Sequence, residues 1–323
     1  MESRIGELAA LGTAICWTVT ALSFESAGRR IGSLVVNIVR LVMAAALFAL
    51  YGWVVRGMAI PLDLPRTAWI WLGLSGLVGF VIGDLLLFQA FVDIGARVSM
   101  LIYASVPPLT AVLGLIVLDE TLGVLGIAGM VLTVAGITIV VAKRTSGAHA
   151  PAPHARAAGR GGTRGRAETA DPEAAATPQR RTRGVLLAFG GALGQAGGLI
   201  LGRLGAGRTF DAFAATQIRV LAAIVGFSLV FTLSRRWRTV APAIRDAGAM
   251  ARVGLGAVFG PFLGVSLGLF AAQNSTAAVA STIMALVPVL IIAPAVILFR
   301  ERVTVREIAG AIVAVAGVAM LFW

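Results

Sequence analysis

The chain has 323 residues, of which 58% are hydrophobic and 13% charged, and its mean hydropathy is +0.92. This composition excludes an ordinary soluble globular protein, in which about 25% of residues carry charge. The net charge of +12 would suit a nucleic-acid partner, but nine of the 27 Lys and Arg residues crowd into residues 143–183, so we expect no such partner. The sequence predicts an all-α integral membrane protein.

Ten apolar segments follow one another along the chain, each close to the ~20 residues that a membrane-crossing helix needs. They span residues 4–24, 33–54, 68–91, 97–118, 123–142, 184–203, 212–234, 250–272, 276–299 and 304–323. Five of them precede residues 143–183 and five follow. We therefore expect ten transmembrane helices in two groups of five.

The stretch between the two groups, residues 143–183, is rich in Ala, Gly, Pro and Arg and almost free of large apolar side chains. Such a segment cannot bury a core, so we expect a disordered basic linker; contact with anionic lipids is the alternative role. It holds the only histidines, His149 and His154, which have no Cys or carboxylate neighbours. Phosphate-binding loops and Ser–His pairings are also absent, so we expect no metal, no cofactor and no enzymatic activity.

The second group of helices repeats the first. Residues 73–141 align with residues 254–322 at a constant offset of 181, without a gap. The matched pairs include Gly79/Gly260, Gly83/Gly264, Ala90/Ala271, Pro107/Pro288, Glu120/Glu301 and Gly129/Gly310. Because each copy holds an odd number of helices, the copies must cross the membrane in opposite directions. We expect two inverted five-helix repeats, residues 1–142 and 184–323, as in many secondary transporters; the alternative is a duplicated scaffold that transports nothing.

Three features recur in both copies. They are an arginine in the second helix (Arg40, Arg219), a proline within the fourth (Pro107, Pro288), and the stretch "LDETLGVLGIAGMVLTVAGITIV" with its twin "FRERVTVREIAGAIVAVAGVAML". In these features the chain resembles the EamA-type, ten-helix branch of the drug/metabolite transporter superfamily. The resemblance covers nearly the whole chain outside the linker.

The resemblance implies a multi-pass protein of the inner or plasma membrane that moves amino acids, other metabolites or drugs. The layout is most similar to amino-acid and aromatic amino-acid exporters. We therefore expect export of an amino acid by alternating access, with another metabolite or a drug as the alternative. The expected partners are a small-molecule substrate and the lipid bilayer, and a monomer suffices to form a site between the repeats.

Arg40 interrupts the apolar run "VNIVRLVMAAALF", although a cation at the centre of a spanning helix costs at least ~2.5–3.5 kcal/mol. It lies seven residues from the start of the second segment, and Asp84 lies seven residues from the end of the third. At about 1.5 Å per residue, both lie roughly 10 Å below the same membrane face. The sequence predicts an ion pair between them, with snorkelling of Arg40 as the alternative.

The second copy lacks this pair, because Val265 stands at the position equivalent to Asp84. Three interpretations of Arg219 stay open. It snorkels to the nearer face, it pairs with Gln195, or it binds an anionic group of the substrate such as a carboxylate.

The remaining candidates are polar, aromatic or helix-breaking. We expect the transport site to be lined also by Trp17, Asn37, Tyr103 and Gln195, with simple packing as the alternative. Pro107 and Pro288 should bend their helices at mid-membrane. For either proline alone a packing kink is the simpler interpretation, and their recurrence in both copies supports a role in gating. Glu120 and Glu301 fall at helix ends, where capping and interfacial solvation explain them.

Basic residues are distributed unevenly between the two membrane faces. The loops on the N-terminal side carry Arg4, Arg56, Arg66, Arg203 and Arg208, and the opposite loops carry the other 20 Lys and Arg residues outside Arg40 and Arg219. The positive-inside rule places the linker in the cytoplasm and both termini outside. The family resemblance implies termini inside, so the two arguments disagree.

Overall fold

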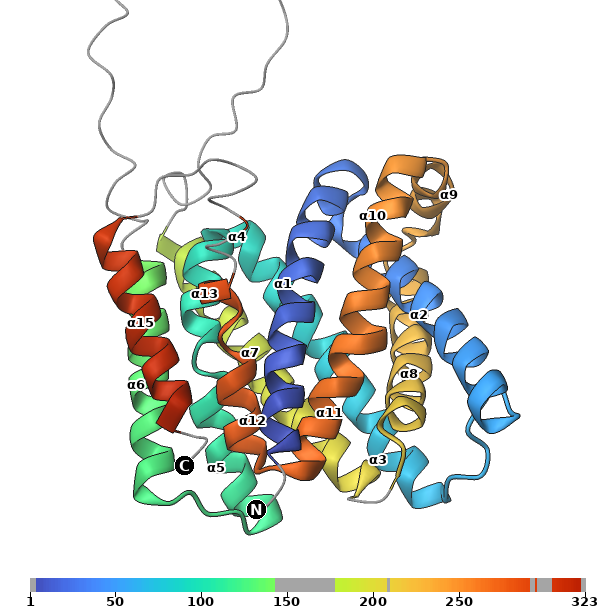
Figure 1. The fold of residues 1–323 in the computed structure, drawn as a ribbon. Helices are drawn as coiled ribbons and strands as arrows, with labels where there is room; N and C mark the ends of the chain where they lie inside the picture. Colours follow the sequence, from blue (N-terminus) through green and yellow to red (C-terminus); the bar gives the residue numbers. More distant parts are fainter. Residues whose placement is uncertain (1–3, 143–177, 208–209, 291–293, 295–303, 321–323) are drawn as a thin grey trace, which may run out of the picture.

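The computed structural model describes residues 4–142, 178–207, 210–290, 294 and 304–320, which form a bundle of helices (Figure 1). Within these residues, six helical segments are long and apolar enough to cross a membrane: Ile5–Gly28, Ser33–Arg56, Arg66–Leu87, Pro178–Ala206, Ala212–Leu233 and Ala247–Asn274. Shorter apolar helices cover Val106–Leu118, Val124–Ile139 and Ile308–Met320. The described residues contain no β-strand, so the all-α membrane class is confirmed.

The helices before the linker run back and forth between two faces of the bundle. α1 (Ile5–Ile31) leads into α2 (Ser33–Arg56) through Gly32, whose φ of 83° is one that glycine adopts without strain. α3 (Arg66–Gly76) continues through the π-helix η1 (Leu77–Gly83) into α4 (Asp84–Tyr103). α5 (Val106–Leu118) and α6 (Val124–Ala142) complete this half.

The helices after the linker follow a similar order. They are α7 (Pro178–Ala206), α8 (Ala212–Leu233), the short η3 (Trp237–Thr239) and α9 (Val240–Ile244), α10 (Ala247–Ala257), the π-helix η4 (Val258–Gly264), α11 (Val265–Asn274), α12 (Ala277–Met284), α13 (Val287–Leu290) and α15 (Val305–Met320). The sequence does not predict η3 and α9. We call the face at which α1 begins and α15 ends the terminal face, and the face at which α6 ends and α7 begins the linker face (Figure 1).

The structure differs from the sequence prediction at several boundaries. The loop expected at residues 92–96 is helical, because α4 runs without interruption from Asp84 to Tyr103. The equivalent α12 starts separately, where the Thr276 side chain accepts a hydrogen bond from the Val279 N–H; the first half has Gly95 at that position, which offers no side-chain acceptor.

The C-terminal boundary of the predicted linker is also wrong. The sequence predicts a linker that reaches residue 183, but α7 begins at Pro178, a residue well suited to the first helical position. The rest of the linker, with both histidines, lies outside the described residues. The last part of the expected segment 276–299 also lies outside them, apart from residue 294.

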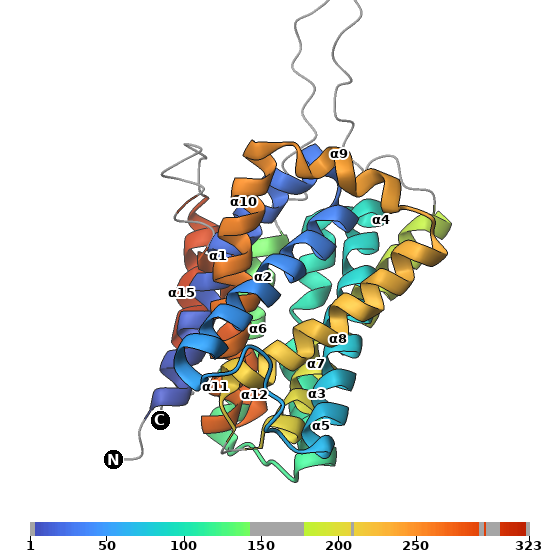
Figure 2. The same cartoon turned by 90° about the vertical axis from the view of Figure 1, so that its right-hand side faces the viewer.

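Each half packs its first helix against the other half. α1 lies along α10, η4 and α11, and α7 lies along α3, η1 and α4 (Figures 1 and 2). A Cβ added at Gly264 would lie 2.8 Å from Cδ1 of Trp17, and one added at Gly83 would lie 3.5 Å from the backbone nitrogen of Gln195. These contacts correspond, because Gly264 follows Gly83 by 181 residues and Gln195 follows Trp17 by 178. Glycine at both sites lets the helices approach closely.

α6 and α15 pack against each other through equivalent residues. A Cβ added at Gly136 would collide with the backbone of Ala314, and one added at Gly317 would collide with Thr133. Ala314 and Gly317 follow Thr133 and Gly136 by 181 residues. The two contacts are therefore the same contact with the halves exchanged.

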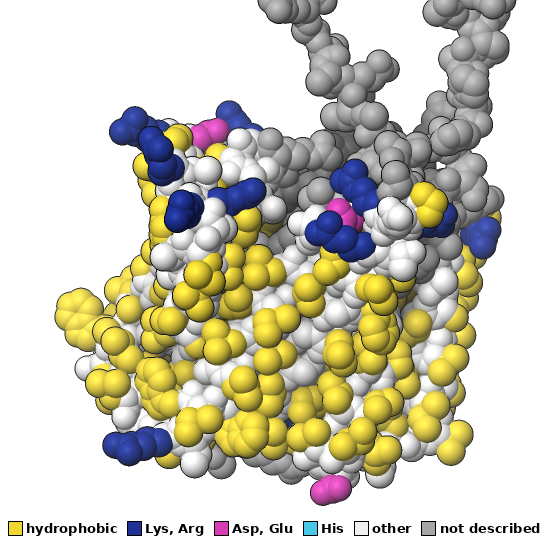
Figure 3. All heavy atoms as spheres, turned by 180° about the vertical axis from the view of Figure 1, so that it is seen from behind, with side chains coloured by type: hydrophobic (Ala, Val, Ile, Leu, Met, Phe, Trp, Pro, Cys, Tyr) yellow, Lys and Arg dark blue, Asp and Glu magenta, His cyan; other side chains and the backbone are white. Residues whose placement is uncertain are grey.

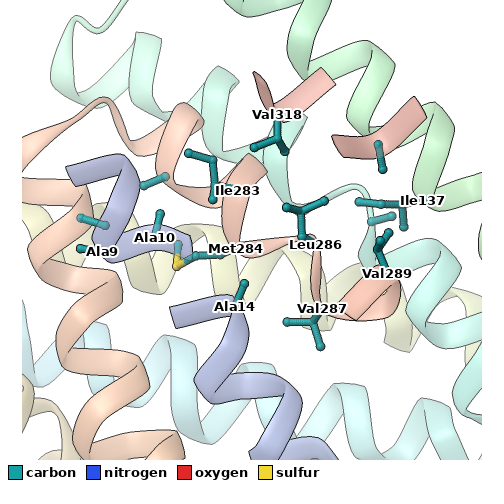
Figure 4. Close-up of a cluster of buried hydrophobic side chains, with 14 of the residues drawn as sticks. Ala9, Ala10, Ala14, Ile137, Ile283, Met284, Leu286, Val287, Val289 and Val318 are labelled. Atoms are coloured by element: carbon teal, nitrogen blue, oxygen red, sulfur yellow. The ribbon is translucent and has the colours of Figure 1, made fainter. Parts of the chain in front are cut away.

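The interior and the surface divide as expected for a membrane protein. A cluster of buried apolar side chains joins the two halves beside α1 and includes Ala10, Ala14, Ile137, Ile283 and Leu286 (Figure 4). On the surface shown in Figure 3, apolar side chains cover the middle of the bundle, and Lys and Arg side chains gather near the linker face. The apolar zone is the surface that suits contact with lipid.

Candidate functional site

A cavity of about 230 Å³ lies inside the bundle, between helices from both halves of the chain. Six of the seven expected site residues line it: Trp17, Arg40, Asp84, Tyr103, Gln195 and Arg219. Ligand pockets in proteins usually measure ~300–1,000 Å³, so this cavity suits a small molecule. The structure thus brings most of the expected site residues together.

Facing walls of the cavity come from equivalent positions of the two halves. Lining residues related by the 181-residue offset are Phe80/Pro261, Asp84/Val265, Leu87/Gly268, Tyr103/Met284, Ala104/Ala285 and Val106/Val287, and those related by 178 are Trp17/Gln195 and Ala21/Leu199. The side chains differ in six of these eight pairs. The walls are therefore alike in backbone position and mostly unlike in chemistry.

The predicted pair of Arg40 and Asp84 is confirmed. The two side chains form an ion pair and are only 12% and 17% exposed. Asp84 is the first residue of α4, directly after η1, and the Cζ atom of Arg40 also lies 5.3 Å from the ring centroid of Phe24. Arg40 is thus neutralised inside the bundle rather than drawn to the membrane face.

Arg219, in α8, has no such carboxylate. The residue is 5% exposed, and its guanidinium forms no hydrogen bond or ion pair with any other described residue, Gln195 included. Its Cζ lies 5.0 Å from the ring centroid of Phe80 in η1. The expected absence of a carboxylate partner is confirmed, and pairing with Gln195 is wrong.

Asn37 is the one expected site residue that does not line the cavity. It lies one helical turn before Arg40 in α2 and is 1% exposed. Because α2 begins at the linker face, Asn37 lies one helical turn closer to that face than Arg40, which lines the cavity. Its Oδ1 has no hydrogen-bond partner within the described part of the chain.

The two candidate gating prolines lie at helix breaks rather than at bends. Pro107 is the second residue of α5, and Ala104 and Ser105 separate α5 from α4. Pro288 is the second residue of α13, after the equivalent break at residues 285–286. Proline fits the start of a helix because no intrahelical donor is needed there. The breaks lie beside the cavity, whose lining includes Tyr103, Ala104, Met284 and Ala285.

A polar cluster at the terminal face is absent from the sequence-based expectations. Glu120, in the turn between α5 and α6, forms an ion pair with Arg203 of α7 and accepts a hydrogen bond of 2.8 Å from the backbone N–H of Ala277, the first residue of α12. The Glu120 side chain is 12% exposed, so the expected interfacial solvation is wrong, whereas the expected capping role fits its contact with the first N–H of α12. Arg203 lies inside α7 and not in a loop. Glu301 lies outside the described residues.

We call Glu120, Arg203 and Ala277 the terminal-face cluster. The sequence feature that indicates this cluster is Arg203, an arginine in an otherwise apolar segment, as Arg40 is in the second segment. The cluster joins a residue before the linker to two residues after it.

The lining of the cavity combines a few polar and charged groups with apolar walls. Within residues 4–142 and the described parts that follow the linker, no three His, Cys, Asp or Glu side chains come together as a metal site would require. The cavity offers instead one ion pair, one free guanidinium, an amide, a phenol and an indole, set among apolar walls. Such groups can orient a small polar molecule by charge and hydrogen bonds.

Comparison with known proteins agrees with this arrangement. The model of the EamA-like transporter family matches residues 4–142 and again residues 182–323. A solved structure described only as "Crystal structure of protein" is similar over 98% of this chain and 95% of that chain, with a TM-score of 0.70 and 17% sequence identity. No curated protein matches the chain. Because the two family matches together cover most of its length, the chain belongs to the EamA-like transporter family of membrane proteins.

Proposed function

We propose that this protein is a secondary transporter that exports a small amino acid-like metabolite through the central cavity by alternating access. The observation that carries the proposal is the cavity itself, which is lined by equivalent positions of the two halves and holds charged groups inside the bundle. Charged side chains within membrane-spanning segments are costly, and in membrane proteins they mark substrate or ion pathways. Family membership supports transport of a small molecule.

The proposal includes an inverted repeat of ten helices, with one copy in residues 1–142 and the other from Pro178, where α7 begins, to residue 323. α1 begins at the terminal face and α7 at the linker face (Figure 1). The π-helices η1 and η4 occupy equivalent residues, 181 apart. The exchanged contacts of α1 with η4 and of α7 with η1 support the same symmetry. Midplane sites between inverted repeats are a recurrent feature of secondary transporters.

Alternating access requires that contacts between the halves form on one face and break on the other. The terminal-face cluster is such a contact, because it ties the turn before α6 to α7 and α12. The helix breaks before Pro107 and Pro288 supply points at which the cavity walls can move without bending a continuous helix. We propose that the cluster opens when the cavity faces the terminal side.

For orientation, we propose that the linker face is cytoplasmic in the inner or plasma membrane. The described arginines at the ends of helices on that face, and between α8 and α10, are Arg30, Arg180, Arg181, Arg183, Arg235, Arg236, Arg238, Arg245 and Arg306, against Arg4, Arg56 and Arg66 at helix ends on the terminal face. The burial of Arg203 within α7 removes one cation from the terminal-face loops and widens the asymmetry. The positive-inside rule supports this orientation.

Labelling of one cysteine tests the orientation. In a Cys16→Ala background, Ser146→Cys in the linker should resist an impermeant thiol reagent added to intact cells, and a cysteine at Leu62, in the turn after α2, should react. Reaction of the linker cysteine alone would overturn the proposed orientation.

Flux into proteoliposomes tests transport. Purified protein should catalyse uptake and counterflow of at least one member of a panel of radiolabelled amino acids. Ala104→Phe places a large side chain on the cavity wall and should abolish flux, whereas Val124→Phe, at a residue that is 87% exposed on α6, should leave it unchanged. Absence of flux with every amino acid, other metabolite and drug tested would favour a membrane scaffold.

A further inference from the structure

Arg219 is a buried cation without a counterion inside the cavity. It is 5% exposed, and its Nε has no partner among the described residues. The equivalent Arg40 is neutralised by Asp84. In the second half the equivalent of that aspartate is Val265, which also lines the cavity.

The side chain of Arg219 points into the bundle and not toward the nearer face. Its backbone lies beside Gly76, since a Cβ added there would collide with the Arg219 backbone. Its guanidinium lies over the ring of Phe80, and it lies close to Cβ atoms added at Gly79 (3.8 Å) and at Gly202 of α7 (3.5 Å). Because Arg219 is only 5% exposed and lines the cavity, its guanidinium stays inside the bundle and does not snorkel to the membrane face.

The charges of the cavity do not cancel. Arg40 and Asp84 neutralise each other, which leaves one positive charge on Arg219 among the charged lining residues. A ring face such as that of Phe80 attracts a guanidinium but supplies no acceptor for its N–H groups. A buried charge needs a hydrogen-bonded partner of opposite sign. The site is complete only when an anion enters the cavity.

We propose that Arg219 binds the carboxylate of a monocarboxylate or amino-acid substrate, through two parallel hydrogen bonds from its planar guanidinium. A single carboxylate matches both the one unbalanced charge and the fork of donors that arginine presents. The apolar part of the substrate then lies against Phe80, Leu199, Leu269 and Met284, which line the same cavity. This assignment rests on the proposed transport function and names the chemical class of its substrate.

Binding to the purified wild-type protein gives the first test, independent of flux. The probes are 3-phenylpropanoate, phenylalanine and 2-phenylethylamine, which share a phenyl ring and differ in their charged groups. Both carboxylates should raise the unfolding temperature with increasing concentration, as a ligand of the folded state does, and the amine should not. Equal stabilisation by the amine, or none by either carboxylate, overturns the assignment.

Three variants locate the effect at Arg219. Arg219→Gln should weaken carboxylate binding by about tenfold or more, and Arg219→Lys should weaken it less, because a lysine keeps the charge without the fork. Val265→Asp should give Arg219 an internal partner and so abolish carboxylate binding in a protein that stays folded. The matched control is Arg56→Gln, which removes an arginine paired with Asp63 outside the cavity and should leave binding unchanged.

The outcomes separate this assignment from the transport proposal. Flux of amines that is insensitive to Arg219→Gln would sustain transport and overturn the carboxylate subsite. Carboxylate binding that Val265→Asp abolishes, in a protein without flux, would sustain the subsite and overturn transport. Unchanged carboxylate binding in folded Val265→Asp or Arg219→Gln protein overturns the subsite whatever the flux.

Discussion

The hydroxyl of Thr133 lies 3.4 Å from the carbonyl oxygen of Ala314, the residue that occupies the same position in the other half of the chain. Contact between equivalent residues is expected where a two-fold axis passes between two elements. α6 and α15 therefore pack through equivalent residues, and a change of side chain at this crossing affects the packing of both helices.

The first prediction concerns that crossing. Gly136→Ala should destabilise the protein by about 1–3 kcal/mol, because the added methyl group overlaps the Ala314 backbone and forces α6 and α15 apart. The matched control is Gly126→Ala on the same helix, where the new Cβ meets only the Leu122 side chain. That change should be neutral or stabilise by up to about 1 kcal/mol, since alanine is the better helix former. Thermal unfolding in detergent measures both, and equal effects would mean that the crossing is not tightly packed.

The second prediction concerns Arg40 and Asp84. Arg40→Ala or Asp84→Ala alone should destabilise by about 3–5 kcal/mol if water does not reach the remaining charge, because that charge is left buried and unpaired. The double variant should cost much less than the sum. A double-mutant cycle measures the coupling.

The exposed pair of Arg56 and Asp63 is the control for this cycle, with side chains 19% and 46% exposed. Its coupling should stay within about 1 kcal/mol, as is usual for surface pairs. Additive effects of the Arg40 and Asp84 changes would show that their contact contributes no stability.

The third prediction concerns the terminal-face cluster. Glu120→Gln removes the charge that pairs with Arg203 but keeps an oxygen that can accept from the Ala277 N–H. The cavity should then open more often to the terminal side. An Ala285→Cys probe on the cavity wall, in a Cys16→Ala background, should be labelled severalfold faster by an impermeant reagent at the terminal face.

Arg56→Gln is the control for this measurement, because it breaks another ion pair of the terminal face, the one with Asp63, outside the cluster. It should leave the labelling rate of the Ala285→Cys probe unchanged. If Glu120→Gln left the labelling rate of the Ala285→Cys probe unchanged in folded protein, the cluster would not be what keeps the cavity closed to the terminal side.

The fourth prediction concerns the linker face. Asp93 of α4 is 3% exposed and faces Arg180 and Arg183 at 3.5 and 3.4 Å. Replacing both arginines by Gln should destabilise by about 1–2 kcal/mol, less than for a buried pair, because both arginines are in contact with solvent. Arg181→Gln, on the same exposed turn, should have no effect. High salt should shrink the difference between the two variants, and thermal unfolding at two ionic strengths checks this.

Apolar segments, the internal repeat and the depth of Arg40 and Asp84 were enough to predict the membrane class and the confirmed ion pair. Segment length and helical rise depend only on local sequence, so they can be read without knowing how the helices pack. The terminal-face cluster could not be predicted in this way, because Glu120 and Arg203 are 83 residues apart and meet only through packing of the halves.

Asn37 and the breaks before Pro107 and Pro288 also depend on how the helices pack, which the local sequence does not determine. Asn37 and Arg40 lie on neighbouring turns of one helix face, and only the position of the cavity along α2 decides which one lines it. Prolines near mid-membrane predict an irregularity, but the placement of Pro107 at a helix start rather than at a bend depends on Ala104 and Ser105 leaving the helix first. The local sequence therefore predicts where the α-helix is interrupted, but not whether the interruption is a bend or a break.

The π-helix η1 ends at Gly83, immediately before Asp84. A π-turn holds about one residue more than an α-turn, and such bulges behave as single-residue insertions in an α-helix. Removing one residue from η1 would restore α-helical winding and rotate the start of α4 by about 100° relative to α3. Position 84 would then turn away from Arg40, and a neighbouring apolar side chain would face it instead. The ion pair of Arg40 therefore depends on the number of residues in the turns of η1 as much as on the presence of an aspartate at position 84.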